Sequence, residues 1–345
     1  MAPSRWRGLA IIVSVLLLAS CGASTAPSPT SGAPSVGATN GAASPSTRAT
    51  PAGSGPPGTI EAAGATHIDV SGEPDWVALA GGSAWVAVVG GVRKVDAATG
   101  KVDGLVPIDD VVCLAMDVGF DSVWAGGCQK PMLARIEPKS GLLFTPPIAL
   151  PIRGIQAESS IAAGEGGVWL VSVDHELVRV DPITNRADPD TWPLPDGAAA
   201  ARAGLGSIWV TISTTDTLLR ISPADPKTSQ AIKVGDRPRF LAIGEGAIWV
   251  MNQGAGSVSR VDTTGTVVAT IPVSDVSIQG GDIAVGGGSV WVRIEQDLVV
   301  RIDPATNTVT DRYGPPSGSG SVAADADAVW VTAHDTASLW RLPLR

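Results

Sequence analysis

A tryptophan recurs seven times along the 345-residue chain, each time at the end of a similar apolar phrase. The seven residues are Trp85, Trp124, Trp169, Trp209, Trp249, Trp291 and Trp330. Their mean spacing is about 41 residues, a period that is typical of β-propellers in which each repeat forms one blade. The repeat therefore predicts an all-β, seven-bladed propeller over residues 60–345.

Each repeat reads as an apolar strand, a Gly-rich turn, a strand that carries the tryptophan, a loop, and two further strands. In the clearest repeat, residues 240–243 and 247–250 are the first two expected strands, residues 257–262 the third and residues 266–273 the fourth. Short apolar or alternating runs bounded by Gly, Asp and Pro are strand signals. Past residue 60 no long stretch has a helical period.

The two ends of the repeat region complement each other. The last repeat stops after its third strand at residues 338–342, while residues 67–71 match the fourth-strand phrase found at residues 269–274. We therefore expect a strand at 66–71 to pair beside the strand at 338–343. This pairing would close the ring and remove the exposed sheet edges of an open array.

A second phrase, Arg-apolar-acid-Pro, ends the third strand of several repeats. It occurs at Arg135-Ile136-Glu137-Pro138, Arg179-Val180-Asp181-Pro182 and Arg301-Ile302-Asp303-Pro304, and with serine at Arg220-Ile221-Ser222-Pro223. A ring of such acids suggests metal binding, but short polar side chains also bond the backbone of a following turn, and we favour that interpretation. By the same reasoning, the repeated tryptophan is interpreted as packing between blades rather than ligand stacking.

The N-terminal residues carry the features of an export signal. Arg5 and Arg7 precede an apolar stretch at residues 9–18, which is too short to span a bilayer. The sequence Leu18-Ala19-Ser20-Cys21-Gly22 that follows resembles the lipobox of bacterial lipoproteins, which implies cleavage before Cys21 and its lipidation. The alternative is an ordinary signal peptide with an incidental cysteine. We expect a signal peptide over residues 1–20.

Residues 21–59 are almost entirely Ala, Ser, Thr, Pro and Gly, a composition that cannot bury enough apolar surface to fold. We interpret them as a disordered tether between the membrane and the propeller. An extracytoplasmic compartment permits disulfides, and Cys113 and Cys128 flank one expected hairpin, so a bond between them is predicted. The net charge of −9 argues against a nucleic-acid partner.

The phrase Gly288-Ser289-Val290-Trp291-Val292, followed by residues 301–307, resembles the repeats of virginiamycin B lyase-like and YVTN-type propellers. The resemblance covers residues 60–345. It implies the propeller fold, and for the lyases a metal-dependent site with His near the start of first strands and with Glu and His just after second strands.

The matching positions of this chain do not hold those residues. Three residues after each repeat tryptophan stand Val88, Gly127, Ser172, Ile212, Asn252, Ile294 and Ala333, with no Glu among them. Nine residues before it stand Trp76, Ala115, Ser160, Ala200, Phe240, Asp282 and Ser321, with no His. The histidines His67, His175 and His334 lie elsewhere. We therefore predict no metal and no cofactor, and the sequence identifies no catalytic residues.

One end of the predicted channel remains as a candidate binding face, because concave mouths with mixed polar groups commonly bind ligands. The loops that join strands two and three, and successive blades, place several polar residues there, from which we select Trp76, Arg239, Asn252, Arg293 and His334. The alternative is an ordinary solvated loop surface.

Three functions follow from these features. The first is a membrane-anchored, extracytoplasmic lipoprotein, monomeric, that acts as a non-catalytic scaffold for a protein, peptide or small-molecule ligand. The second is a metal-dependent lyase or lactonase of the virginiamycin B lyase-like type. The third is a sensory or quinone-binding role. The absence of a recognisable catalytic motif in the sequence favours the first.

Overall fold

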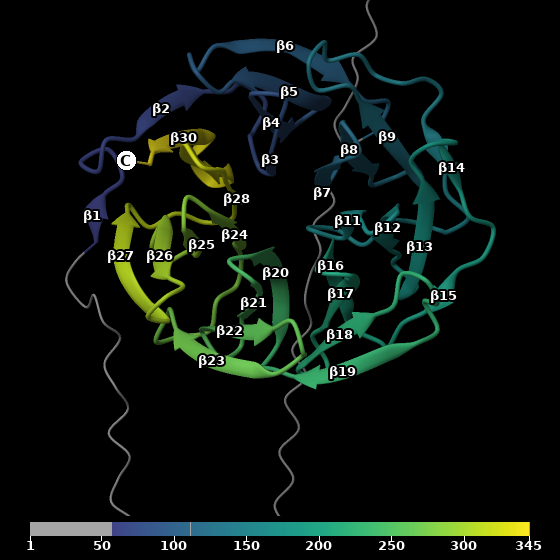
Figure 1. Ribbon diagram of the computed structural model, residues 1–345. Coiled ribbons are helices and arrows are strands. Elements are labelled where there is room, and N and C mark those ends of the chain that lie inside the picture. Colours follow the sequence, from purple (N-terminus) through teal and green to yellow (C-terminus); the bar gives the residue numbers. More distant parts are fainter. Residues whose placement is uncertain (1–56, 111, 345) are drawn as a thin grey trace, which may run out of the picture. The chain divides into compact units, whose positions relative to one another are not determined.

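The computed structural model describes residues 57–110 and 112–344, which form a seven-bladed β-propeller (Figure 1). Apart from a single 3₁₀ turn, η1 (His334–Thr336), the regular elements of these residues are all strands. None of their helices has the length and apolar character that a membrane span requires. The predicted fold class is confirmed. The expected signal peptide, most of the tether and Cys21 lie outside the described residues.

In blades one to six, antiparallel strands follow one another in chain order from the axis to the rim, whereas the outermost strand of blade seven comes from the N-terminal part of the chain (Figure 1). Blades one to three comprise β3 (Val77–Ala80), β4 (Ser83–Val88), β5 (Gly91–Asp96) and β6 (Val102–Pro107); β7 (Val112–Gly119), β8 (Ser122–Gly127), β9 (Met132–Ile136) and β10 (Ile148–Ala149); and β11 (Ile161–Gly164), β12 (Gly167–Val171), β13 (Glu176–Asp181), β14 (Arg186–Ala187) and β15 (Trp192–Pro193).

The later blades follow the same plan. Blades four to six comprise β16 (Ala198–Gly204), β17 (Ser207–Ile212), β18 (Thr217–Ile221) and β19 (Ser229–Lys233); β20 (Pro238–Gly244), β21 (Ala247–Asn252), β22 (Ser257–Asp262) and β23 (Val267–Pro272); and β24 (Asp282–Gly286), β25 (Ser289–Arg293), β26 (Val299–Asp303) and β27 (Thr308–Gly314). Blade seven combines β28 (Val322–Ala324), β29 (Ala328–Ala333) and β30 (Ser338–Pro343) with the N-terminal strand β2 (Thr66–Asp69).

The ring is closed by strands from both ends of the described chain. β2 pairs antiparallel with β30, so that Asp69 lies opposite Ser338. This is the predicted closure. A further strand, β1 (Gly58–Thr59), adds to the rim of blade six by pairing parallel with β27, which the sequence did not indicate. The N-terminal segment thus joins two neighbouring blades.

The seven repeat tryptophans are buried, with at most 1% of each side chain exposed. Each contacts hydrophobic residues of the following blade: Trp124 clusters with Val168 and Val180 of blade three, and Trp330 with Ala84 and Val95 of blade one. Because every blade needs the same contact with its neighbour, the residue recurs at the same position. The interpretation as inter-blade packing is confirmed.

The repeated arginine of the third strand has a partner in the same tryptophan. Arg260 lies opposite Trp249 across β21 and β22, and its guanidinium is 4.9 Å from the centre of the indole. The same stacking by Arg or Lys occurs over all seven repeat tryptophans. Cation–π pairing therefore explains why a basic residue recurs there.

The acids that follow this arginine stabilise turns. Asp303 accepts a hydrogen bond from the Ala305 backbone N–H at 2.8 Å. The Ser140 side chain and backbone hydrogen-bond to Glu137 and lower the pKa of that carboxyl to about 2. The acids thus serve their own turns, as the sequence interpretation held.

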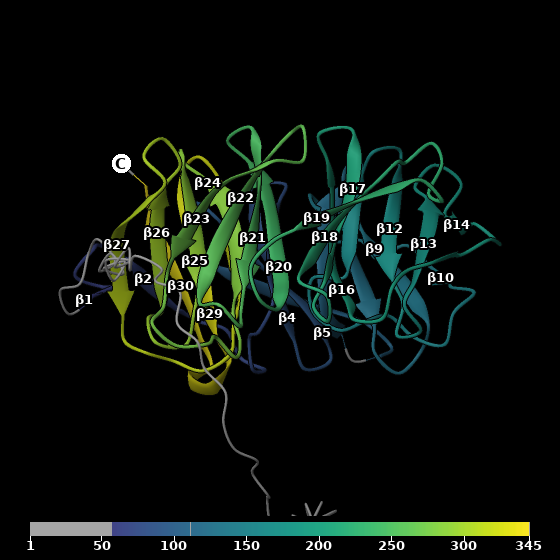
Figure 2. The ribbon, with the colours of Figure 1, turned by 90° about the horizontal axis from the view of Figure 1, so that it is seen from below.

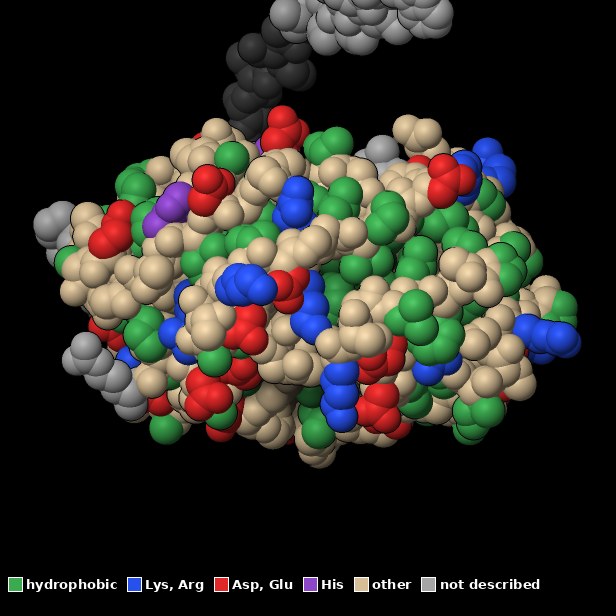
Figure 3. Space-filling model, turned by 90° about the horizontal axis from the view of Figure 1, so that it is seen from above, with side chains coloured by type: hydrophobic (Ala, Val, Ile, Leu, Met, Phe, Trp, Pro, Cys, Tyr) green, Lys and Arg blue, Asp and Glu red, His purple; other side chains and the backbone are tan. Residues whose placement is uncertain are grey.

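The two ends of the axial channel belong to different faces. The loop face carries the connections between successive blades and between strands two and three, including η1, which lies at the lower side of Figure 2. The hairpin face, on the opposite side, carries the turns between strands one and two. On the edge seen in Figure 3, acidic and basic side chains are interspersed with apolar ones, so this edge presents no large patch of a single charge.

Candidate functional site: the axial channel

The first strands of the seven blades surround a cavity of about 350 Å³ on the propeller axis. Exposure along these strands rises in one direction: Trp76 and Asp282 at its inner end are 3% and 2% exposed, whereas Val118 and Ile243, near the turns to strand two, are half-buried. The cavity therefore opens on the hairpin face.

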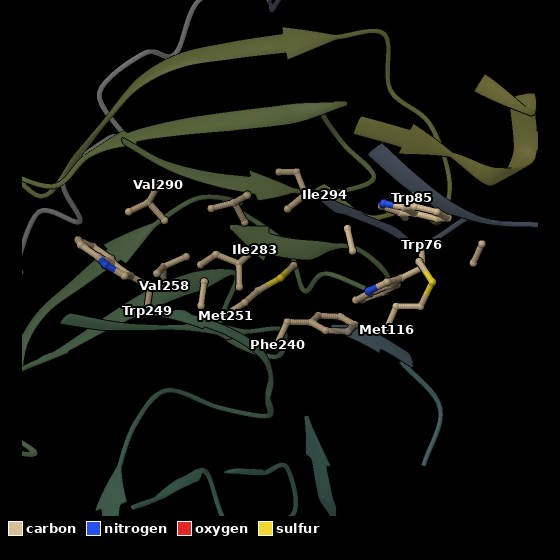
Figure 4. Packing of buried hydrophobic residues seen from close by; sticks show 14 of the residues in the cluster. Trp76, Trp85, Met116, Phe240, Trp249, Met251, Val258, Ile283, Val290 and Ile294 are labelled. Atoms are coloured by element: carbon tan, nitrogen blue, oxygen red, sulfur yellow. The ribbon is translucent and has the colours of Figure 1, made fainter. Parts of the chain in front are cut away.

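Two aromatic side chains lie across the axis at the inner end of this cavity. Trp76 precedes β3 in blade one and Phe240 lies on β20 in blade five, and their ring centres are 6.0 Å apart (Figure 4). Met116 and Met251 pack in the same cluster, which extends from the interface of blades one and two to that of blades five and six. We call Trp76 and Phe240 the aromatic plug, because they close the channel toward the loop face.

Just outside the plug, the residue that pairs with the repeat tryptophan is alanine in five blades. The exceptions are Asp117, opposite Trp124, and Arg202, opposite Trp209. Asp117 accepts a hydrogen bond from the Ala163 N–H at 2.8 Å, and the Arg202 Nη1 donates to three backbone carbonyls, of Ala201, Ser159 and Ile161. Small side chains elsewhere at this level keep the cavity open.

A second carboxyl, Asp282, lies deeper in the same cavity. Its Oδ2 accepts a hydrogen bond from the Val322 N–H at 3.3 Å, while its Oδ1 is buried and has no partner among the described residues. Burial raises the pKa of Asp282 to about 7, although the positive charge of Arg202 acts in the opposite direction. Burial likewise raises the pKa of Asp117. The cavity thus holds two carboxyls whose ionisation is opposed by desolvation.

Three of the five residues selected from the sequence are buried. Trp76 forms part of the aromatic plug. Asn252 is fully buried and donates from its Nδ2 to the hydroxyls of Ser257 and Ser259. Arg293 is fully buried and donates to backbone carbonyls, including those of Thr332 at 3.1 Å and Gly318 at 2.7 Å. Their positions correct the expectation of a surface contact, because the loops between blades fold over the ends of the second strands.

The other two selected residues remain accessible on the loop face. The Arg239 side chain is 18% exposed and forms an ion pair with Glu158 at 2.9 Å. The His334 side chain is 45% exposed, and its Nε2 lies 4.0 Å from Glu73. A shallow hollow of about 140 Å³ is lined by His334, Glu73 and Asp75. Burial raises the pKa of Asp75, and the nearby His334 opposes that rise.

In the described part of the chain, no three His, Cys, Asp or Glu side chains form a group that could hold a metal ion. Val112 pairs with Gly127, which brings the neighbourhoods of Cys113 and Cys128 to the same end of blade two, and the bond between them stays a prediction. Lipidation at Cys21 lies outside the described residues.

Fold and channel together define a closed seven-bladed propeller with one plugged and one open axial end. Solved structures that share this fold include a catalytically inactive virginiamycin B lyase from Staphylococcus aureus with quinupristin, at 16% identity and a TM-score of 0.68, covering 81% of this chain and 99% of that one. The predicted resemblance of fold is thereby confirmed.

Other solved propellers are equally similar in shape. A streptogramin B lyase aligns at 16% identity with a TM-score of 0.66, over 80% of this chain and 96% of that one. The WD40 repeats of RRP9 align at 11% identity with a TM-score of 0.69, over 81% and 97%. No protein-family model and no characterised sequence matches the chain. Since propellers with unrelated roles align equally well, the comparisons show the fold alone.

Asp117 and Arg202 are not among the residues selected from the sequence. A signal for them exists, because the position seven residues before each repeat tryptophan is otherwise alanine: Ala78, Ala162, Ala242, Ala284 and Ala323. Alanine is sufficient for packing at this position in five blades, so the fold alone does not explain the charged residues in the other two. The same comparison, made one position at a time across the repeats, finds both residues.

Proposed function

We propose that the protein is an extracytoplasmic lipoprotein, anchored to the cell membrane through Cys21, whose propeller is a non-catalytic scaffold that binds a partner at its loop face. One observation carries the non-catalytic part. At the loop-face end of the channel, several of the positions that the lyase resemblance assigns to catalysis are filled by side chains that pack or bond within the propeller, as with Asn252 between two serines and Phe240 in the aromatic plug.

The accessible polar groups of the loop face support a binding role. Arg239 and His334 project from different blades near the same end of the channel, and Glu158 and Glu73 lie beside them. Arginine combines a positive charge with a planar guanidinium group. It is common among the residues that contribute most of the binding free energy at protein interfaces. We therefore place the partner over these two residues.

A photo-crosslinking experiment in intact cells tests the binding face. A crosslinking amino acid replaces His334 in one variant and Ile183, which is 90% exposed on the hairpin face, in the matched control. The proposal expects a discrete crosslinked product from position 334 that is absent from position 183. The same products from both positions, or none from position 334, would refute the loop face as the binding site.

Membrane attachment has its own test. The Cys21→Ala variant should accumulate as an unprocessed or mislocalised precursor, because no other residue can take the lipid of a lipobox. Metabolic labelling with a fatty acid and detergent phase partition measure this directly. Recovery of the variant in the acylated membrane fraction would contradict the anchor.

A metal-dependent lyase or lactonase is the second candidate. His334, Glu73 and Asp75 line a common hollow, although among the described residues they do not form a group that could hold a metal ion. Turnover of quinupristin, the molecule bound in the similar lyase structure, is measured with an added divalent metal, together with the metal content of the purified protein. We expect no turnover. Stoichiometric metal combined with activity that is lost in His334→Ala would establish the enzyme instead.

A further inference from the structure

The cavity on the hairpin face has no role in the proposed function, which concerns the opposite face. It is enclosed by seven strands and holds three charged side chains, Asp117, Arg202 and Asp282. Protein interiors normally satisfy their buried polar groups. Asp282 belongs to the lining of an open cavity and has a buried carboxyl oxygen with no partner among the described residues, which needs an explanation.

The geometry points to a binding site for a small organic cation that carries a primary ammonium group and an apolar body. The Asp282 side chain is part of the cavity lining, and its buried Oδ1 is an acceptor with no partner among the described residues. An ammonium provides both the donor and the charge that stabilises an ionised carboxylate in a desolvated position.

The balance of charges favours a cation over an anion. With both carboxyls ionised, Asp117 and Asp282 outnumber the single guanidinium of Arg202. The Arg202 Nη1 is moreover directed at the backbone carbonyls of Ser159, Ile161 and Ala201, so this part of its hydrogen-bonding capacity is already used. A carboxylate or phosphate ligand would meet two negative groups, whereas one ammonium would neutralise the excess.

The walls suit the rest of such a ligand. The indole of Trp76 lies at the inner end of the cavity, where an aromatic ring stabilises a nearby cation. The sides are lined by Ala78, Ala242 and other small aliphatic side chains that can contact an alkyl chain. From Asp282 to the rim is three residues of strand, or roughly 10 Å. A short alkylamine matches this depth.

Titration calorimetry with butylammonium chloride tests the site on the full chain in non-ionic detergent at pH 8, where an alkylammonium is still charged. We expect saturable binding of one butylammonium per chain. Asp282→Asn should weaken it about tenfold or more, because a hydrogen bond to a charged group is lost. Asp75→Asn, a partly buried carboxyl on the other face, is the matched control and should leave the affinity unchanged.

Two further measurements keep the inference open to refutation. Ala323→Leu fills the cavity without changing its charge and should abolish binding, and circular dichroism confirms that each variant is folded. Tetramethylammonium has the charge but no N–H donor and should bind more weakly than butylammonium. The site is wrong if the wild-type chain does not bind, if neither Asp282→Asn nor Ala323→Leu weakens binding, or if both cations bind equally well.

Discussion

The two ends of the axial channel are built from the same seven first strands and yet differ in nearly every property. Toward the loop face, Trp76 and Phe240 meet across the axis and join the hydrophobic cores of opposite blade interfaces. Toward the hairpin face, alanines leave an open cavity that holds Asp117 and Arg202. The side chains at two successive levels of the first strands, contributed by several blades, thus determine that the channel is closed at one end and open at the other. The backbone scaffold is the same at both ends.

Removing one half of the aromatic plug should have the largest effect. Phe240→Ala takes a fully buried ring from the centre of the molecule, and large-to-small changes of this kind cost about 3–5 kcal/mol. The matched control is Phe144→Ala, whose ring is 39% exposed. Urea denaturation measures both. Equal losses in the two variants would mean that the plug does not stabilise the propeller.

At the inner end of the open cavity, Asp282→Asn should raise stability in a pH-dependent manner. Because burial raises the folded-state pKa of Asp282 to about 7, the folded protein binds the proton more tightly than the unfolded chain. Its contribution to stability is present at low pH and is lost as the pH rises from about 4 to 7, a loss on the order of 4 kcal/mol.

The asparagine variant has no such proton to release. The unfolding free energies of wild type and variant should be similar at pH 4, and the variant should be more stable at pH 8. Asp117 and Asp75, whose pKa values are also raised, remain in both proteins, so their effect cancels in the difference. A difference that is the same at both values of pH would contradict the burial of an ionisable Asp282.

A smaller effect is expected from the predicted disulfide at the loop-face end of blade two. If Cys113 and Cys128 are bonded, Cys128→Ser should lower stability by about 3 kcal/mol, the entropic estimate for a loop of roughly 15 residues. Mass spectrometry of the alkylated, unreduced protein determines whether the bond exists. Two alkylated cysteines beyond residue 100 in the exported protein would exclude it.

The smallest effect is expected for an ion pair on the loop face. Arg239 and Glu158 are only partly exposed, and a double-mutant cycle with Arg239→Met and Glu158→Gln should give a coupling energy of about 1 kcal/mol. Added salt should reduce it, because the pair is reached by solvent. The cycle with Lys101 and Asp103, an exposed pair, is the comparison and should give less. Coupling that does not exceed that of the exposed pair would show that the ion pair does not organise the loop face.

The propeller scaffold could be predicted from the sequence because every blade makes the same packing contacts with its neighbour. A tryptophan that must contact the next blade and an arginine that stacks on it recur with the period of the fold, and a missing last strand predicts the closure by β2. The strand β1 has only two residues and leaves no pattern to read.

The channel could not be predicted in the same way. Trp76 and Phe240 are far apart in the sequence, and nothing local indicates that their rings meet across the axis. The polar character of Arg293 suggested exposure, but its guanidinium is surrounded by backbone carbonyls that only the folded loops bring together. Comparison between repeats, rather than within one, reveals the side chains that the scaffold itself does not require.

The closure of the ring also bears on how the chain folds. The pairing of Asp69 with Ser338 joins positions near opposite ends of the described chain, and contacts of such long range form slowly because the entropy of closing the loop is lost first. We therefore expect blade seven to be the last to form. Until it does, β30 exposes an unpaired edge to which a strand of another molecule can add, so the interval before closure is the period of greatest risk for misassembly.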